Sequence, residues 1–248
     1  MSKPELQRWL IVVPVFQVVL PEAFYNFCAL MMRTGRDLRD THSFDIMQAS
    51  RSLLHMVMNQ AAQAVLDNGY AGMVVFDDDC LPPADAVTRL MKHAEAGHDF
   101  VAAMGYMRLY PYTTTVGKYY DEGQTLIEST GELAGHRWLD KLPSKERGLI
   151  EADFCGFPLV LMSRRLIEKV EKPFFGTADK HGGQMTHDVF ACRRIQDAGF
   201  KVLVDTSIEC GHITAAPVID GVTRDVARAA VQWQEKAREA QIVRPAGA

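Results

Sequence analysis

The sequence lacks an apolar run long enough to cross a membrane. The N-terminal apolar stretch Trp9–Leu20 contains Pro14 and Gln17 and is closed by Pro21, so it falls short of the roughly 20 residues that a spanning helix needs. No small-residue cleavage site of a secretory signal follows it. We therefore expect a cytoplasmic protein with no membrane span, in which this stretch forms a buried strand.

Cysteine pairs with a recognisable spacing are also missing. The five cysteines are an odd number, are scattered along the chain, and include no CxxC pair. This arrangement argues against a disulfide framework and against a structural zinc site. We expect free, buried thiols, as in a reducing compartment.

No single sign of charge dominates the chain, and no internal repeat or low-complexity tract interrupts it. The formal net charge is −4, which does not suggest non-specific binding to nucleic acid. Apolar residues make up 48% of the chain, enough for a sizeable core. The length of 248 residues then fits one large domain with at most a small extension.

What the sequence does contain is an alternation of apolar strands and amphipathic helices. The first part predicts, in order, strand 10–15, helix 21–32, helix 47–66, strand 73–76, a helix from 82 to 97 and strand 100–104. Residues 106–150 carry five tyrosines and predict short strands and long loops, which often hold the variable part of a site. The rest predicts strand 150–163, helices 164–170 and 187–198, strand 201–205 and a terminal helix 224–240. This alternation indicates an α/β fold with a mainly parallel sheet.

An acidic cluster follows the strand 73–76 directly. In open α/β sheets, ligands bind beyond the carboxyl ends of the strands, and Asp77, Asp78 and Asp79 stand at that place. Unpaired carboxylates there would repel one another, and a divalent cation such as Mg²⁺ or Mn²⁺ would relieve this. If the segment is extended, Asp77 and Asp79 project to one side and can share an ion. The alternative is a solvated acidic turn before a helix.

Arg51 extends the apolar stripe of the expected helix 47–66 toward its N-terminus, so we expect it to point toward the sheet beside the acidic cluster. There it would form a structural ion pair or contact a phosphate. Asp188, in the first turn of a helix, either complements the helix dipole or acts as a general base. His212 either ligates a metal through a neutral imidazole or is structural. Gly156 marks a bulge or a close approach to substrate.

Taken in order, these features resemble a GT-A glycosyltransferase of the broad family 2 kind found in bacterial and phage genomes. The resemblance covers roughly residues 10–213 and rests on the order of the motifs. Its pieces are the first strand Ile11-Val12-Val13-Pro14, the arginine-bearing Ala49-Ser50-Arg51-Ser52, the DxD segment Val75-Phe76-Asp77-Asp78-Asp79, the glycine-bearing segment Phe154 to Leu161, Thr186-His187-Asp188 and Glu209-Cys210-Gly211-His212. Ser52 stands where many members have Asn, and His187 where many have Glu.

The resemblance implies a GT-A fold, with a Rossmann-like mixed sheet flanked by helices. It implies a catalytic domain over residues 1–222, with a nucleotide-sugar half (about 1–105) and an acceptor half (about 106–222), followed by a C-terminal helix and tail (223–248). It further implies a nucleoside-diphosphate sugar as donor, whose diphosphate is held by Mn²⁺ or Mg²⁺. The residues implied for these roles are Asp79 and His212 as metal ligands, Asp77 at the ion or the ribose, Pro14, Arg51, Asp78 and Gly156 near the nucleotide, and Asp188 as the base.

The expected activity is therefore transfer of a hexosyl or pentosyl group to an acceptor hydroxyl. The acceptor stays open between a glycan, a metabolite, a protein and a modified DNA base. A nucleotidyltransferase that makes a nucleotide sugar is an alternative, but Val15–Val18 offers neither the Gly-rich loop nor the basic residue that such enzymes usually place after the first strand. A non-catalytic carbohydrate-binding module on the same fold is another alternative.

Overall fold

The structure is a computed structural model of the 248-residue chain. It describes residues 6–15, 19–50, 52–108, 112–119, 136–138, 147–178, 185–213, 221 and 225. Arg51 and nearly all of the expected C-terminal helix and tail, residues 223–248, lie outside the described residues.

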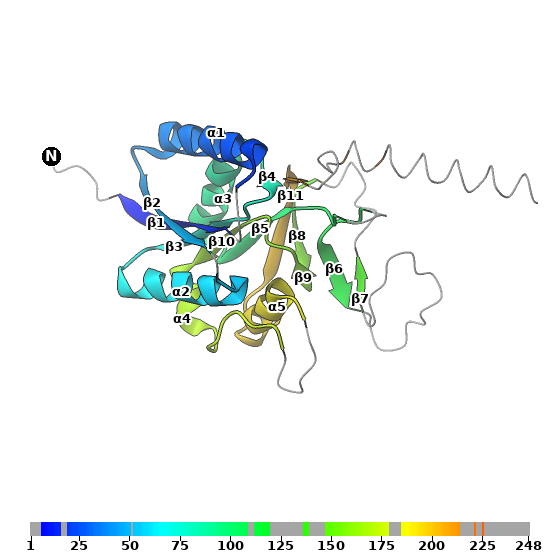
Figure 1. The fold of residues 1–248 in the computed structure, drawn as a ribbon. Coiled ribbons are helices and arrows are strands. Elements are labelled where there is room, and N and C mark those ends of the chain that lie inside the picture. Colours follow the sequence, from blue (N-terminus) through cyan, green and yellow to red (C-terminus); the bar gives the residue numbers. More distant parts are fainter. Residues whose placement is uncertain are drawn as a thin grey trace, which may run out of the picture.

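The main sheet has seven strands in the order β2-β1-β3-β10-β5-β11-β8 (Figure 1). They are β1 Gln7–Val15, β2 His42–Ser50, β3 Gly72–Phe76, β5 Phe100–Met104, β8 Leu149–Ala152, β10 Leu159–Ser163 and β11 Val202–Glu209. The pairings β1–β2, β1–β3 and β5–β11 are parallel, whereas β10 is antiparallel to β3 and β5, and β8 to β11. β2, β1, β3, β5 and β11 therefore run in one direction. The fold is the mixed α/β architecture that the sequence predicts.

Helices cover both faces of this sheet. α1 Pro21–Leu38 and α3 Ala86–Glu95 lie on one face, and α2 Leu54–Asp67, α4 Arg164–Lys169 and α5 His187–Asp197 lie on the other (Figure 1). Alternate side chains of each central strand enter one of two cores, as period-2 strand geometry requires. In β3, for example, Met73 and Val75 join the core under α2, whereas Val74 and Phe76 join the core under α1 and α3.

Two smaller sheets lie beyond the main one. β4 Cys80–Leu81 pairs with β12 Gly211–His212, and β6 Val116–Tyr119 lies between β7 His136–Trp138 and β9 Phe154–Cys155. The prediction of a single strand over 150–163 is therefore wrong, because this stretch forms β8, β9 and β10 in two different sheets. Short apolar runs do not reveal where the chain turns from one sheet into another.

The helix expected over 47–66 is partly wrong. Residues 42–50 form the edge strand β2, and α2 begins only at Leu54. The apolar stripe of α2 therefore begins at Leu54, and the expectation that Arg51 extends it is wrong. β2 contains no continuous apolar run, and Ile46 is 54% exposed, as one face of an edge strand can be.

The described residues contain no helix that is both long and apolar enough to span a bilayer. All five cysteines are free thiols, and four of them are buried. The expected division of the chain at residue 222 remains a prediction.

Candidate metal centre

The candidate site lies where three parallel strands end at the same edge of the main sheet. Asp77 follows the last residue of β3, Tyr106 and Arg108 follow β5, and His212 follows β11. Because β3, β5 and β11 run in one direction, these residues meet at one edge although they are more than 100 positions apart in sequence at the extremes. The fold itself therefore brings the two halves of the DxD–His pattern together.

The acidic cluster forms a tight turn. The Cys80 amide donates a hydrogen bond to the Asp77 carbonyl at 3.1 Å, the i to i+3 bond of a β-turn. The alternation expected for an extended segment therefore does not hold. One carboxylate oxygen from each of Asp77, Asp78 and Asp79 lies within 4.8 Å of the others, so all three carboxylates gather on one small volume.

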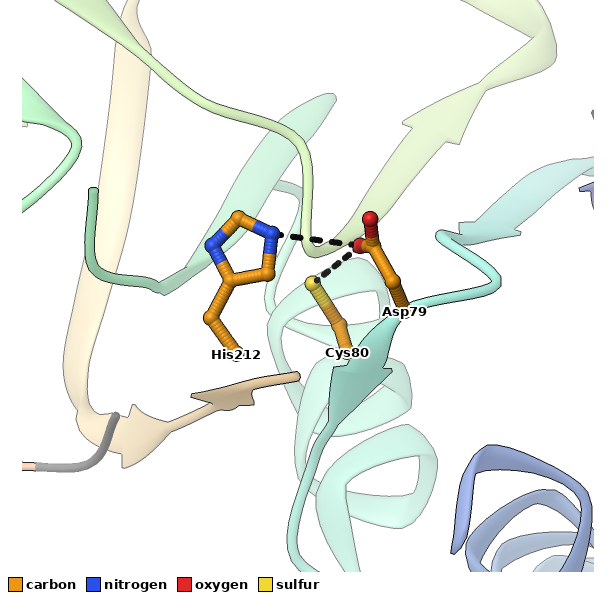
Figure 2. Close-up of side chains that lie close together, drawn as sticks. All are labelled: Asp79, Cys80 and His212. Atoms are coloured by element: carbon orange, nitrogen blue, oxygen red, sulfur yellow. Dashed lines mark hydrogen bonds and ion pairs between the residues drawn. The ribbon is translucent and has the colours of Figure 1, made fainter. Parts of the chain in front are cut away.

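His212 is fixed beside this turn by the backbone. β12 pairs with β4 so that His212 lies opposite Cys80, and the Ile213 amide donates to the Asp79 carbonyl at 2.8 Å. As a result the His212 Nε2 atom is 3.3 Å from Asp79 Oδ1. Figure 2 shows the imidazole facing the Asp79 carboxylate, with Cys80 between them at the base.

The tautomer of His212 follows from its second nitrogen. Nδ1 lies 2.7 Å from the Tyr106 carbonyl, and because a carbonyl only accepts, Nδ1 carries the proton. Burial lowers the pKa of His212 below its ordinary value, so the ring is neutral at pH 7. Nε2 then carries a lone pair, which is the state in which histidine ligates metals.

The carboxylates carry a matching electrostatic signature. Burial raises the pKa of Asp77 to about 6, and the charge of Asp78 adds to the rise, while His212 and Arg108 oppose it. A carboxyl group is held in this way where negative charges are crowded and poorly solvated. A cation bound here would relieve that cost.

Cys80 contributes a protonated thiol. Burial raises its pKa well above the ordinary value, and Sγ donates to Asp79 Oδ1 at 3.5 Å. Asp79, Cys80 and His212 together offer three donor atoms within 4.8 Å of one another. With carboxylate oxygens and a neutral imidazole at the front of the site, the donor set fits Mn²⁺ or Mg²⁺, and the thiol orients Asp79.

Two of the residues expected at the nucleotide have described positions. Pro14 is buried in β1, opposite Ala49 of β2. Gly156 is buried, and its amide donates to the Thr115 carbonyl at 2.7 Å. A Cβ atom at position 156 would lie 2.8 Å from the Thr115 Cβ, so the close approach observed at this glycine is to the protein's own chain.

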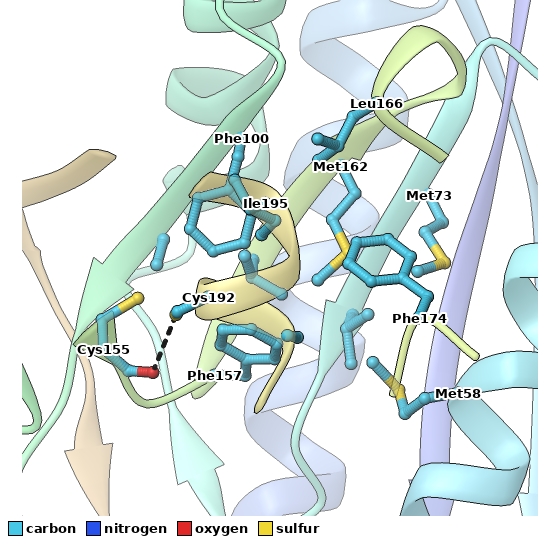
Figure 3. Packing of buried hydrophobic residues seen from close by; sticks show 14 of the residues in the cluster. Met58, Met73, Phe100, Cys155, Phe157, Met162, Leu166, Phe174, Cys192 and Ile195 are labelled. Atoms are coloured by element: carbon cyan, nitrogen blue, oxygen red, sulfur yellow. Dashed lines mark hydrogen bonds between the residues drawn. The ribbon is translucent and has the colours of Figure 1, made fainter. Parts of the chain in front are cut away.

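Asp188 stands in the first turn of α5, after the N-cap residue Thr186. The Thr186 side chain makes no capping hydrogen bond, and Asp188 Oδ1 accepts from the Val189 amide at 2.8 Å. α5 packs on β9, where the Cys192 thiol approaches the Cys155 carbonyl at 3.8 Å (Figure 3). The charge of Asp188 also acts on Cys155, after burial and Cys192, to raise the pKa of that thiol.

The segment from Cys155 to Pro158 connects Asp188 to the acidic turn. The Pro158 carbonyl accepts a hydrogen bond from the Asp77 amide at 3.2 Å, and Cys155 at the other end lies beside α5. Three residues of extended chain span at most about 10 Å. This short segment therefore separates the acidic turn from the strand on which α5 packs, and Asp188 is not one of the clustered carboxylates.

Sequence reasoning missed Tyr106, Glu209 and Arg108. The buried Tyr106 holds His212 through its carbonyl, and its hydroxyl donates to Glu209 Oε1 at 2.7 Å. Arg108 forms an ion pair with Asp79, and its Nε donates to His212 Nε2 at 2.7 Å. The only signal for Tyr106 and Arg108 in the sequence is their place just after strand 100–104, whose carboxyl end had to reach the same edge.

Comparison with known proteins places the fold but gives no family. No family model matches the chain, and no curated protein matches it. Among solved structures, the protein A197 from STIV superposes with a TM-score of 0.52 at 16% identity, covering 84% of this chain and 86% of that one. A UDP-glucose pyrophosphorylase complexed with UDP-glucose gives a TM-score of 0.45 at 9% identity, covering 93% and 100%. A Drosophila galactosyltransferase in complex with manganese, UDP-Gal and xylobiose gives 0.37 at 14% identity, covering 82% and 66%. At 16% identity the likeness to A197 concerns the fold alone.

Proposed function

We propose that the chain is a metal-dependent glycosyltransferase that moves a sugar from a nucleoside-diphosphate sugar to an acceptor hydroxyl. The observation that carries the proposal is the 3.3 Å distance between Asp79 Oδ1 and Nε2 of a neutral His212, beside two further carboxylates at the carboxyl end of β3. These residues are far apart in the sequence, and their meeting at a ligand-binding edge supports a shared ion.

Asp77, Asp79 and His212 are the residues that would hold Mn²⁺ or Mg²⁺. When bound, such an ion neutralises the charge that develops on a departing diphosphate. Asp78 lies at the same edge and Pro14 lies on the neighbouring strand β1, and both would face the nucleotide. Arg51 follows β2 in the sequence and would also face the nucleotide. Gly156 would shape the border with the acceptor half.

Asp188 is the proposed general base. It would accept the proton of the acceptor hydroxyl as the oxygen attacks the anomeric carbon and the bond to the diphosphate breaks. The carboxylate is only part-buried and has room to receive a proton from a substrate. The short link from Cys155 to Pro158 supports a base close to the donor but separate from the ion.

A panel of nucleotide sugars with Mn²⁺ tests this function. The purified protein is offered each donor, with release of nucleoside diphosphate and thermal shift as readouts, and Asp79→Asn as the matched inactive control. We expect at least one donor to stabilise the wild type and to release nucleoside diphosphate only when metal is present.

The same panel separates the competing functions. Consumption of a nucleoside triphosphate with a sugar phosphate, while every nucleotide sugar fails, would indicate a nucleotidyltransferase. Absence of turnover with every donor, together with carbohydrate binding that ignores the metal, would indicate a binding module.

A further inference from the structure

The Arg108 guanidinium lies on the two side chains proposed to hold the ion. It pairs with the Asp79 carboxylate, and its Nε donates to His212 Nε2 at 2.7 Å. Asp79 and His212 follow β3 and β11 of the fold, and Arg108 is the cation that touches both. Its side chain is 54% exposed, so the contact is not enforced by burial.

Arg108 and a metal ion cannot use this site together. With its proton on Nδ1, the His212 ring has a single lone pair on Nε2, and that lone pair accepts the Arg108 hydrogen bond. A metal ion bound to Nε2 would need the same lone pair. Binding of the ion therefore requires the guanidinium to leave.

The negative charge of the acidic turn explains why the Arg108 guanidinium lies beside it. Three carboxylates share one turn, and the charge of Arg108 is among those that counter the raised pKa of Asp77. A cation at this position offsets their mutual repulsion when no metal is bound. Arginine suits the role because its planar fork reaches a carboxylate and a second acceptor at once.

We propose that Arg108 is a built-in counter-cation that competes with the divalent ion for Asp79 and His212 and, once displaced, binds the diphosphate of the donor. The first half concerns the protein and the metal alone, and the second half rests on the proposed function. A displaced guanidinium stays within a side-chain length of the ion and carries the donor geometry that phosphate oxygens prefer.

Metal binding without any nucleotide tests the first half. Mn²⁺ is titrated into the wild type and Arg108→Gln, with bound metal followed by electron paramagnetic resonance. Removing the competitor should tighten Mn²⁺ binding about tenfold, within the usual range of coupling between two ligands of one protein. Equal or weaker binding by the variant would overturn the proposal.

Arg147→Gln is the matched control. Arg147 is also exposed, lies 3.6 Å from Glu209, and its loss changes the net charge by the same amount, but no contact joins it to Asp79 or His212 among the described interactions. Long-range electrostatics alone would tighten Mn²⁺ binding alike in both variants, and that result would also overturn the proposal. Melting temperatures in chelator confirm that both variants fold.

The second half predicts an effect of opposite sign. At saturating Mg²⁺, Arg108→Gln should bind inorganic pyrophosphate about tenfold more weakly than the wild type, because it loses a charge-assisted contact, whereas its metal binding improves. Loss of both affinities would mean that Arg108 merely organises the site. If Arg108→Gln binds Mn²⁺ more tightly but the wild type turns over no nucleotide sugar, the counter-cation role stands and the proposed function is wrong. If the wild type turns over a nucleotide sugar but Arg108→Gln binds Mn²⁺ with unchanged affinity, the proposed function stands and the counter-cation role is wrong.

Discussion

At the scale of single residues, the site depends on one carboxylate more than on its neighbours. Asp79 touches His212, Cys80 and Arg108, whereas the charge of Asp77 is partly suppressed by burial. A metal ion without Asp79 as a ligand would lose the carboxylate that contacts the His212 imidazole. Asp79 is therefore where a small change has the largest expected effect on the metal.

Asp79→Asn should weaken Mn²⁺ binding by at least about 100-fold, because the amide keeps the shape of the side chain but not its charge, and first ligands of a metal matter at least as much as their outer partners. Isothermal titration of metal-free protein with Mn²⁺ measures this. Asp40→Asn is the control, since the Asp40 side chain is 87% exposed and should leave the affinity unchanged. An affinity kept by Asp79→Asn would remove this residue from the metal centre.

At the scale of elements, the sequence predicts the central strands β1, β3 and β5 and misses the edge strand β2. Strands at 10–15, 73–76 and 100–104 are apolar and lie inside the sheet, and each appears in the structure. β2 was not predicted because its residues are half polar and its edge position leaves Asp45 and Ile46 exposed. Its stability comes from its parallel pairing with β1, which no local pattern contains.

Glycine positions give a test of packing between elements. Gly156 joins β9 to β10, and a Cβ there would lie 2.8 Å from Thr115 Cβ, so Gly156→Ala should destabilise the fold by about 1–3 kcal/mol. Gly35 lies in α1, and a Cβ added there would meet nothing within 4 Å, so Gly35→Ala should stabilise the fold by about 0.4–1 kcal/mol. Urea denaturation of both variants measures the two signs, and equal effects would contradict the crowding at Gly156.

The bulge of β11 is tied to α3 through Asp205. Asp205 is 5% exposed, and its carboxylate accepts hydrogen bonds from His93 Nε2 at 2.9 Å and the Ser207 amide at 2.9 Å. Burial disfavours the ionised form, but these hydrogen bonds outweigh it and hold the pKa of Asp205 below its ordinary value. The ionised carboxylate therefore stabilises the folded state.

Asp205→Asn should cost about 1–3 kcal/mol of unfolding free energy at neutral pH, as expected for a buried hydrogen-bonded group. Because the folded pKa is depressed, the advantage of the wild type is complete above the ordinary carboxyl pKa of about 4 and disappears as the pH falls through the lower folded value. Denaturant melts of both proteins from neutral to strongly acidic pH measure the difference. A difference independent of pH would show that the Asp205 charge is not what stabilises the bulge.

At the scale of the whole molecule, the direction of the strands explains which parts of the site were predictable. Asp77 and His212 each follow a strand of the parallel set, so their meeting at one edge follows from topology. The place and direction of the antiparallel β10 between β3 and β5 could not be read from its own residues, because its apolar sequence fits either direction. The roles of Tyr106 and Arg108 could not be predicted for a related reason. Their contacts are made across 104 to 106 positions of the chain, and no local sequence pattern indicates such contacts.

The fold also separates the residues proposed to hold the metal from the residue proposed to act on the acceptor. The metal residues belong to the edge formed by β3 and β11, whereas Asp188 belongs to α5 on the other side of the Cys155–Pro158 link. A residue that acts on the acceptor alone should therefore be separable from one that holds the donor. The two functions can be measured independently in one variant.

Asp188→Asn should leave Mn²⁺ and pyrophosphate binding within about twofold of the wild type, but slow sugar transfer by about 100-fold to 10,000-fold, the usual contribution of a general base. Transfer is followed by nucleoside diphosphate release with the donor found in the panel, and binding by calorimetry. Asp197→Asn, an exposed aspartate at the far end of the same helix, is the control and should keep full activity. Normal transfer by Asp188→Asn would exclude Asp188 as the base. A parallel loss of metal binding would mean that α5 also supports the metal centre, contrary to the separation that the Cys155–Pro158 link implies.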